Sequence, residues 1–563
     1  MLGGAAALPW LATAGETFAQ TLPQTPAQLS DAALRQRAFD IRTATARSNL
    51  AIPIPPHPDN GDEQRYPNRI GSDSRGLPHN ARGEVDLNAY SVLTAAYDSG
   101  DPDAFERIPL GGTRKFLNPI GSFAVSLVGP DVTQFAIPPA PALASTARAS
   151  EAIELYWQSL LRDVPLSEYR DDTSHPLIRA AVDELNKVTD FNGPKVGGRV
   201  TPQTLFRGNA WYVDRADTSG RSGRWVTPPG VTDGPVVSQF LLRDAPFSTQ
   251  FISARIRAYQ PIDFLTEYDE WLRVQNGQPA ARPVQFESAN RFIATGRDLA
   301  VYAHLAPSLS WSAAQLLATP AFPPNPSYGG LFPANVATTN LSNPYRNSKT
   351  QAGGASSFAQ PYFQWLIAQG TPRAIRAAYF QKFRYHRTLR PEAYAGLIHH
   401  RIASNVRDYP VHESVLGSAA LARSREKFGS HLLSHVYPEG APIHSSYPSG
   451  ASIIGAVGAT LLKAFFDESL VIPSPLQADP NDPTRTIAYA GTPLTVGGEL
   501  NKLALNYGTG RSWAGIHWRS DVAAALSLGE DIAIGLLRDE RATFRESFAG
   551  FSFTKFDGTK ITI

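Results

Sequence analysis

The chain has 563 residues, 52 of them Lys or Arg and 50 Asp or Glu, which gives a formal net charge of +2. Residues of the two signs are interspersed, so the sequence lacks the clustered basic charge by which proteins bind nucleic acid or an acidic membrane surface. It also lacks the long uncharged apolar stretch that a membrane-spanning helix needs. We therefore expect a soluble protein that neither binds nucleic acid nor spans a membrane.

The chain contains no Cys, and its one Met is Met1. Thiols and thioethers are the side chains most readily oxidised, so their absence would protect a protein that works with peroxide or hypohalous acid. A GC-rich genome or an oxidising compartment explains the same composition equally well. The lack of Cys does exclude thiolate catalysis, zinc sites that use Cys, and disulfides.

The first fifteen residues are apolar and small, like the middle and end of an export signal, but no basic segment precedes them. Either the recorded start is too late and a twin-arginine leader is missing, or residues 1–30 form a small-residue tail. We expect an exported protein, periplasmic or secreted.

Helical periodicity dominates the chain, and few segments alternate as strands do. The first predicted helix, residues 31–49, places Leu34, Phe39 and Ile41 among regularly spaced charges. Six more helices are predicted at residues 147–161, 175–188, 290–304, 361–389, 452–466 and 521–537. We therefore expect an all-α protein built from helical bundles, either as one compact body or as two or three domains.

Two long stretches rich in Pro, Asn and Gly interrupt the helices, at residues 52–86 and 321–357. Loops of this length are usually functional or cover another surface, so the first is interpreted as an arm that packs on a partner subunit. The second is interpreted as a boundary. The predicted organisation is a tail over residues 1–30, an N-terminal helical region over 31–350 and a C-terminal helical region over 351–563.

The first cluster of chemically informative residues is Lys382, His386 and Arg390, followed by Pro391. A spacing of four predicts one face of a helix that ends near Arg390, because a residue before proline avoids the helical conformation. Lys and Arg aimed in one direction suit a dense anion. Taken alone, the cluster fits a solvated basic face better.

The second cluster runs from His444 to Ala451 and precedes the predicted helix 452–466. Ser449 and Gly450 would then lie at a helix N-terminus, where free backbone N–H groups and the helix dipole attract an oxyanion. An ordinary Ser cap is the simpler interpretation of this segment by itself.

The third cluster contains Arg511, His517 and Asp521. His517 and Asp521 are four residues apart, so Asp521 can hold the imidazole and fix its tautomer if the turn is helical. A His beside an Asp is more often structural, and this cluster too is weak by itself.

In their order and spacing, the three clusters resemble the vanadium-dependent haloperoxidases and the related acid phosphatases. The segments Gln381–Glu392, His444–Gly450 and Gly515–Asp521 are most similar to the algal and bacterial bromoperoxidase branch. The resemblance covers roughly residues 360–540, and the first 350 residues contribute no motif to it.

The resemblance implies a vanadate cofactor and a reaction in which hydrogen peroxide oxidises a halide to a hypohalous-acid equivalent that halogenates an organic acceptor. His517 would bond to vanadium, with His386 and Asp521 as supporting residues behind the ligands. Relatives are often homo-oligomers, dimers or larger. The residues implied to hold vanadate are Lys382, Arg390, Ser449, Gly450, Arg511 and His517.

The sequence departs from the family at position 451, where relatives commonly have a His that acts as the acid–base group and this chain has Ala451. Alanine cannot transfer a proton, so another group does this work or the chemistry has changed. His444 is the substitute candidate, although it is equally well interpreted as a capping or packing residue.

Two other functions stay open at this point. A homologue without peroxide chemistry would be an acid phosphatase, in which His517 attacks a phosphoester, or a vanadate-independent rearrangement enzyme. A non-enzymatic anion-binding or assembly protein that keeps the pocket as a relic is the third possibility. Intact Lys, Arg and His ligands argue against a relic, because burying unpaired cations is costly.

Overall fold

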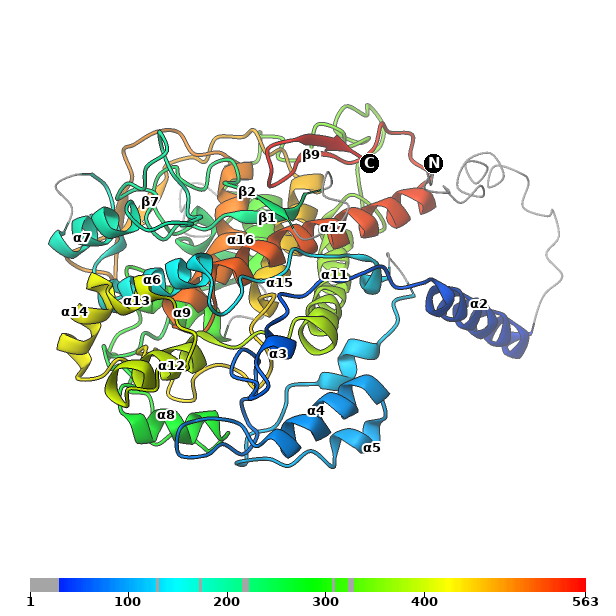
Figure 1. Cartoon of the computed structure of the whole chain (residues 1–563). Coiled ribbons are helices and arrows are strands. Elements are labelled where there is room, and N and C mark those ends of the chain that lie inside the picture. The colour runs from blue at the N-terminus through cyan, green and yellow to red at the C-terminus, as the bar shows by residue number, and fades with distance from the viewer. Residues whose placement is uncertain (1–29, 128–130, 172–174, 215–221, 306–308, 322–328) are drawn as a thin grey trace.

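The computed structural model describes the chain except for residues 1–29, 128–130, 172–174, 215–221, 306–308 and 322–328 (Figure 1). Helices form the body, and the described strands occur only as short pairs. The antiparallel pairs are β1–β2 (Ala210–Val213, Gly223–Val226), β3–β4 (Ala245–Phe247, Gln250–Ile252), β7–β8 (Leu476–Ala478, Thr486–Ala488) and β9–β10 (Ser552–Thr554, Lys560–Thr562). The parallel pair is β5–β6 (Pro320–Ala321, Phe332–Pro333). The expected all-α class with helical bundles is confirmed.

Four long helices form the core of the C-terminal part: α11 (Gln360–Phe380), α15 (Gly450–Phe465), α16 (Val496–Trp513) and α17 (Arg519–Thr543). The apolar helix α15 packs against the other three. Small residues permit this close approach: a Cβ on Gly455 would lie 3.0 Å from the Ala504 carbonyl oxygen of α16, and one on Gly529 of α17 would lie 2.7 Å from Ala456 Cβ. Larger side chains there would push the helices apart.

Shorter helices surround this core. Helix α6 (Thr146–Leu161) is buried along almost its whole length and contacts α7, α13, α14 and α16, while α9 (Gly296–Leu305) lies along α16. The remaining helices are α2 (Asp31–Ala51), α3 (Asp62–Arg65), α4 (Leu87–Ser99), α5 (Pro102–Phe105), α7 (Pro176–Leu185), α8 (Tyr268–Gln275), α10 (Leu309–Ala318), α12 (Pro391–Ala403), α13 (Glu413–Leu416) and α14 (Ala419–Phe428). Short helical turns lie at η1 (Pro119–Phe123), η2 (Val132–Gln134), η3 (Leu166–Glu168), η4 (Gln239–Leu241) and η5 (Gln381–Tyr385).

All seven predicted helices have counterparts, but several ends differ. The predicted helix 290–304 begins only at Gly296, and the predicted helix 361–389 ends with the π-turn η5 at Tyr385. Helix α16, which lacks a clear apolar stripe because it is buried on nearly every side, was not predicted. The predicted tail 1–30 lies, up to residue 29, outside the described residues.

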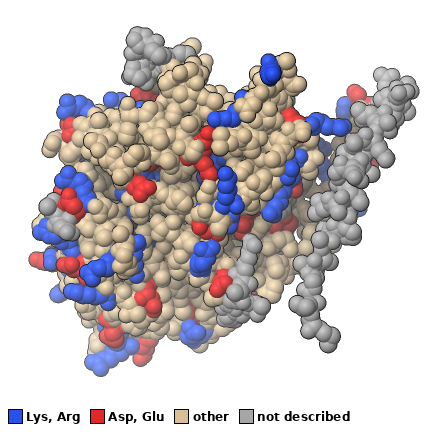
Figure 2. All heavy atoms as spheres, turned by 90° about the horizontal axis from the view of Figure 1, so that it is seen from above, with Lys and Arg blue, Asp and Glu red and all other residues tan. Residues whose placement is uncertain are grey.

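Within the described residues, no helix is long and apolar enough to cross a membrane. On the face in Figure 2, Lys and Arg groups lie among Asp and Glu groups without a large area of one sign.

The segment at residues 52–86 lies against the C-terminal part of its own chain. The Asp73 N–H donates to the Arg387 carbonyl over 2.9 Å, and Arg387 forms an ion pair with Glu63. Arg75 is buried in an ion pair with Glu392 of α12. The segment therefore has partners within its own chain, and its proposed role as an arm on a second subunit stays a prediction.

The described part of residues 321–357 packs on the C-terminal end of α15. Asn340 donates to the Lys463 and Ser552 carbonyls over 2.9 and 2.8 Å, and the Asp467 N–H donates to the Thr338 carbonyl. These contacts join the proposed boundary to the C-terminal bundle. The division at residue 350 stays a prediction.

Candidate functional site

Five helix ends of the C-terminal region lie around one buried position. The π-turn η5 closes α11, α12 begins after Arg390, α15 begins after Ser449, α17 begins after Trp518, and α16 ends at Trp513. Three of these ends are helix N-termini, which carry free N–H groups and a partial positive charge. The arrangement favours negative charge at the point where they converge.

Lys382 lies in η5 and is fully buried. Its Nζ donates to the Ser445 and Ser446 carbonyls, 2.7 Å away in each case. Burial, and then the nearby Arg390, hold the pKa of Lys382 well below its ordinary value. An anion beside Lys382 would raise that pKa and so stabilise the charged amine.

Arg390 is also fully buried, and extended backbone (φ −79°, ψ 156°) makes it the N-cap of α12. The expectation that Lys382, His386 and Arg390 share one helical face is wrong, because the helix ends at Tyr385 and the chain is extended before Pro391. Lys382 and Arg390 nevertheless meet, because both contact the 444–446 segment: the Arg390 guanidinium donates to the His444 carbonyl over 3.0 Å.

His386 lies away from these two cations. Its ring packs edge-on against Tyr447 at 5.1 Å, and its Nε2 has no hydrogen-bond partner among the described residues. Burial lowers the pKa of His386 to about 3, so the ring is neutral. The His386 carbonyl accepts from the Ser445 hydroxyl at 3.1 Å, and the same hydroxyl donates to the Lys382 carbonyl. His386 therefore contacts the site through its backbone, and the supporting role of its side chain stays a prediction.

Ser449 and Gly450 begin helix α15, as the sequence predicts. The Ser449 side chain caps the helix by accepting from the Ser452 N–H at 3.3 Å. A Cβ added to Gly450 would have Ile375 Cδ1, at 3.8 Å, as its nearest neighbour, so space is open beside the backbone. The buried Ser452 Oγ has no partner among the described residues. This helix start therefore has room and unused polar groups.

His517 and Asp521 interact, but not as successive turns of one helix. Helix α17 begins after Trp518, and Asp521 in its first turn accepts from the Trp518 N–H at 3.0 Å and from His517 Nδ1 at 2.7 Å. A proton on Nδ1 leaves Nε2 as the basic nitrogen, and Nε2 faces Arg390 Nη1 at 3.1 Å. Burial, and then the charge of Arg390, hold the pKa of His517 well below its ordinary value.

Arg511 lies in the last turn of α16 and is partly exposed. Its guanidinium carbon is 5.6 Å from the Tyr437 ring centroid, and its buried Nε has no partner among the described residues. Arg511 Nη1 is 3.4 Å from His304 Nδ1, and His304 Nε2 is 3.1 Å from Glu439 Oε1. Sequence reasoning missed His304, Tyr437 and Glu439, because none of them lies in a motif.

His444 lies beside Arg390, and Ala451 lies two residues after Ser449, the N-cap of α15. His444 Nδ1 is 2.9 Å from Arg390 Nη2, and its ring is 5.8 Å from that of Tyr379. Burial, and then Lys382 and Arg390, hold the pKa of His444 well below its ordinary value. Ala451 is half-buried in the first turn of α15.

Two carboxyl groups face these cations. Asp521 is fully buried, and burial raises its pKa. Asp73, from the segment 52–86, was not anticipated: burial raises its pKa to about 6, against the attraction of Arg390 and Arg75. Within the described residues, no group of three or more His, Asp or Glu side chains is placed to hold a metal cation.

The donor set therefore fits a tetrahedral oxyanion. Three cations converge with the start of α15, and buried donors on Arg511 and Ser452 are unused. Isolated buried cations are unfavourable, and an anion bound among them removes that cost. Hydrogen bonds connect six of the residues predicted from the motifs, and these are Lys382, Arg390, His444, Ser449, His517 and Asp521. Arg511 lies close enough for its charge to lower the pKa values of Lys382 and His517.

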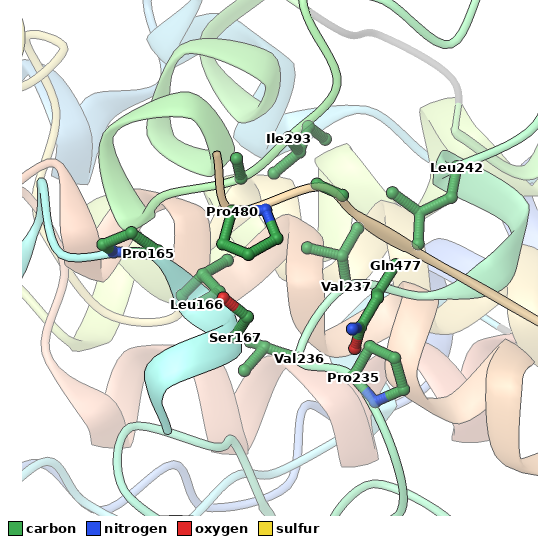
Figure 3. Close-up of a pocket in the computed structure, with 12 residues that line it drawn as sticks. Pro165, Leu166, Ser167, Pro235, Val236, Val237, Leu242, Ile293, Gln477 and Pro480 are labelled. Atoms are coloured by element: carbon green, nitrogen blue, oxygen red, sulfur yellow. The ribbon is translucent and has the colours of Figure 1, made fainter. Parts of the chain in front are cut away.

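A separate cavity of about 40 Å³ lies between η3 and the 477–480 segment (Figure 3). Its wall is mainly apolar, with Pro165, Val237 and Ile293 among the labelled residues, and it has no ionisable side chain. It lacks the groups that acid–base or anion chemistry needs.

Comparison with known proteins gives three kinds of similarity. A sequence model of the VCPO second helical-bundle domain matches residues 366–545. A vanadium-dependent bromoperoxidase of Ascophyllum nodosum is 30% identical over 513 residues, which span 87% of this chain and 86% of that protein. One from Corallina pilulifera is 29% identical, over 93% of this chain and 98% of that protein. The homohexameric structure of the second vanadate-dependent bromoperoxidase from Ascophyllum nodosum aligns with a TM-score of 0.78 and 27% identity, over 96% of this chain and 93% of that chain.

Proposed function

Because this chain belongs to the vanadium-dependent haloperoxidase family, we propose that it uses vanadate to oxidise bromide or chloride with hydrogen peroxide, producing a hypohalous-acid equivalent that halogenates an organic acceptor. The proposal rests on one observation: the buried side chains of Lys382, Arg390 and His517 lie close together at the N-terminus of α15. Such a site matches an oxyanion in charge and in donor geometry.

The residues that would hold vanadate are Lys382, Arg390 and Arg511 by charge, and the Ser449 hydroxyl and Gly450 N–H by hydrogen bonds. His517 would supply its Nε2 to the metal, because Asp521 occupies Nδ1. Bound vanadate supplies the Lewis-acid centre at which peroxide becomes reactive toward halide. The cations of the chain stabilise negative charge that develops there, in a site from which water is largely excluded.

Because Ala451 stands where relatives commonly have an acid–base His, another residue must transfer protons in this site. We infer that His444 takes this role, supported by its place beside Arg390 and by its neutral ring. Lys382 and Arg390 disfavour its protonated form, and a bound oxyanion would offset their charge and bring its pKa closer to neutrality. The protonated form of His444 would then be less disfavoured with an oxyanion bound than without one.

The test is a bromination assay of purified, metal-stripped protein with bromide and peroxide, before and after vanadate is added. Activity should appear with vanadate, and phosphate should slow its appearance because the two oxyanions meet the same donors. Activity that ignores both ions would contradict the cofactor proposal.

Ala451 favours a second candidate, a homologue without peroxide chemistry. An acid phosphatase would use His517 as the nucleophile toward a phosphoester, and its tautomer suits that role as well. Hydrolysis of p-nitrophenyl phosphate without bromination would favour the phosphatase. Absence of both activities would leave a vanadate-independent rearrangement.

We also propose that the protein is exported and forms a homo-oligomer. The apolar first fifteen residues support export. The homohexameric state of the structurally similar bromoperoxidase supports an oligomer.

A further inference from the structure

Helix α2 is the one long helix of the described chain that has no buried residue. In Figure 1 it projects from the body on the side of α4 and α5. Its last turn is tied to the body by Asn49, whose Nδ2 donates to the Ser126 carbonyl over 2.6 Å. Helices in proteins take most of their stability from the packing of an apolar face against other elements. Helix α2 therefore lacks a partner within its own chain.

The apolar side chains of α2 are unusually exposed. Leu34 and Ile41 are 50% and 57% exposed, and Phe39 and Leu50 are 62% and 69% exposed. At about 100° per residue the two pairs lie on roughly opposite sides of the helix. A helix with two such stripes is suited to a place between surfaces rather than on one. The helix also carries four Arg and two Asp, a net charge of +2.

A groove of about 390 Å³, with apolar and polar surface in similar proportion, lies along α5 and η1. Phe105, Ile108, Phe116 and Ile120 line it, with Glu106 and Lys115 at its polar parts. The segment 98–107 beside it holds four acidic residues and one Arg, a net charge of −3. The groove therefore offers apolar surface and negative charge, which complement the exposed side chains and the Arg residues of α2.

We propose that α2 of one copy of this chain docks in the groove along α5 and η1 of a second copy. The proposal goes beyond halide oxidation, and it names the surface through which the homo-oligomer forms. Apolar burial would supply affinity, and the opposite charges would set which surfaces meet. An exchange of this helix between two copies is self-complementary, as two-fold assemblies require.

The apolar part is tested by light scattering and sedimentation of the full chain. The wild type should be larger than a monomer. Phe39→Gln with Leu50→Gln, and separately Leu34→Gln with Ile41→Gln, should each raise the dissociation constant at least tenfold. Thr43→Gln with Ala44→Gln places the same side chains on α2 at small or polar positions and should change it less than about twofold. A monomeric wild type, or an oligomer that both apolar pairs leave unchanged, would overturn the proposal.

The charge part is tested by exchange of sign. Arg37→Asp with Arg42→Asp on the helix, or Asp103→Arg with Glu106→Arg beside the groove, should each weaken self-association. Mixing these two variants should restore association, because each helix then meets a groove of opposite charge on the other chain. Docking of α2 on its own groove would show no rescue on mixing, and that result would refute exchange between copies. These readouts do not depend on bromination, so they separate this inference from the proposed activity.

Discussion

Replacing Asp521 by Asn isolates what this carboxylate does for His517. Asp521 accepts from His517 Nδ1 at 2.7 Å, from the Trp518 N–H at 3.0 Å and from the Ser446 hydroxyl. An amide keeps the shape but loses the charge that holds a proton on Nδ1. Nε2 is then no longer fixed as the free nitrogen. Loss of such a carboxylate–histidine contact typically costs 10- to 100-fold in metal affinity, about 1.4–2.8 kcal/mol. We expect that weakening of vanadate affinity in Asp521→Asn.

Asp73→Asn is the matched control. Asp73 is half-buried, with its Oδ1 enclosed, and lies near Arg390 and Lys382, but it makes no contact with His517 among those described. With a pKa of about 6 it is mostly ionised at pH 7, so its replacement also removes a negative charge. Removing negative charge near an anion site strengthens anion binding. Charge alone therefore predicts equal or tighter vanadate binding in Asp73→Asn.

The two variants are predicted to change vanadate affinity in opposite directions. Calorimetric titration of metal-stripped protein with vanadate measures both constants, and thermal unfolding confirms that each variant is folded. If both variants tighten binding, Asp521 acts only through its charge. The orientation argument for His517 would then be refuted.

Four further predictions concern residues of the same site. Burial raises the pKa of Asp73 from 3.8 to about 6, so the folded state holds this proton more tightly than the unfolded state and loses about 3 kcal/mol of stability as pH rises from 4 to above 6. Urea unfolding should show this component in the wild type, and Asp73→Asn should lack it. His517→Ala should abolish bromination and leave the fold and weak phosphate binding intact, whereas normal turnover would show that His517 is not the metal ligand. His444→Ala should lower turnover by about 10²- to 10⁴-fold with little change in vanadate affinity. Ala451→His should raise turnover if the wild type lacks an efficient proton carrier.

The helical architecture was predictable because apolar periodicity marks the helices that have one buried face. Apolar periodicity failed to predict α16, because nearly every side of this helix is buried and no single apolar stripe can be detected. It also extended the 361–389 helix too far. The π-turn η5 and the extended chain before Pro391 bring Lys382 and Arg390 together by a route that a spacing of four does not describe.

The residues that the structure brings together at the candidate site were predictable from motif order, and the contacts around them were not. His517 and Asp521 are close in sequence, so their contact was expected even though a helix start, rather than a helical turn, produces it. Asp73, by contrast, reaches Arg390 from more than three hundred residues away and lies in a loop rich in Pro and Gly. His304 lies in helix α9 and contacts Arg511 across a separation of 207 residues. Contacts of such sequence separation have no local periodicity or capping pattern from which they could be inferred.

The charges of Lys382 and Arg390 determine how readily His444 could replace the His that relatives have at the position of Ala451. His444 has the surroundings of a neutral ring, because burial and two adjacent cations disfavour its protonated form. An oxyanion among those cations would reverse part of that effect, so the proton affinity of His444 depends on whether the site is filled. A His at position 451 would lie in the first turn of α15, where the chain has the half-buried Ala451. If His444 is the acid–base group, as proposed, an oxyanion that offsets the charge of Lys382 and Arg390 would make its protonated form more accessible.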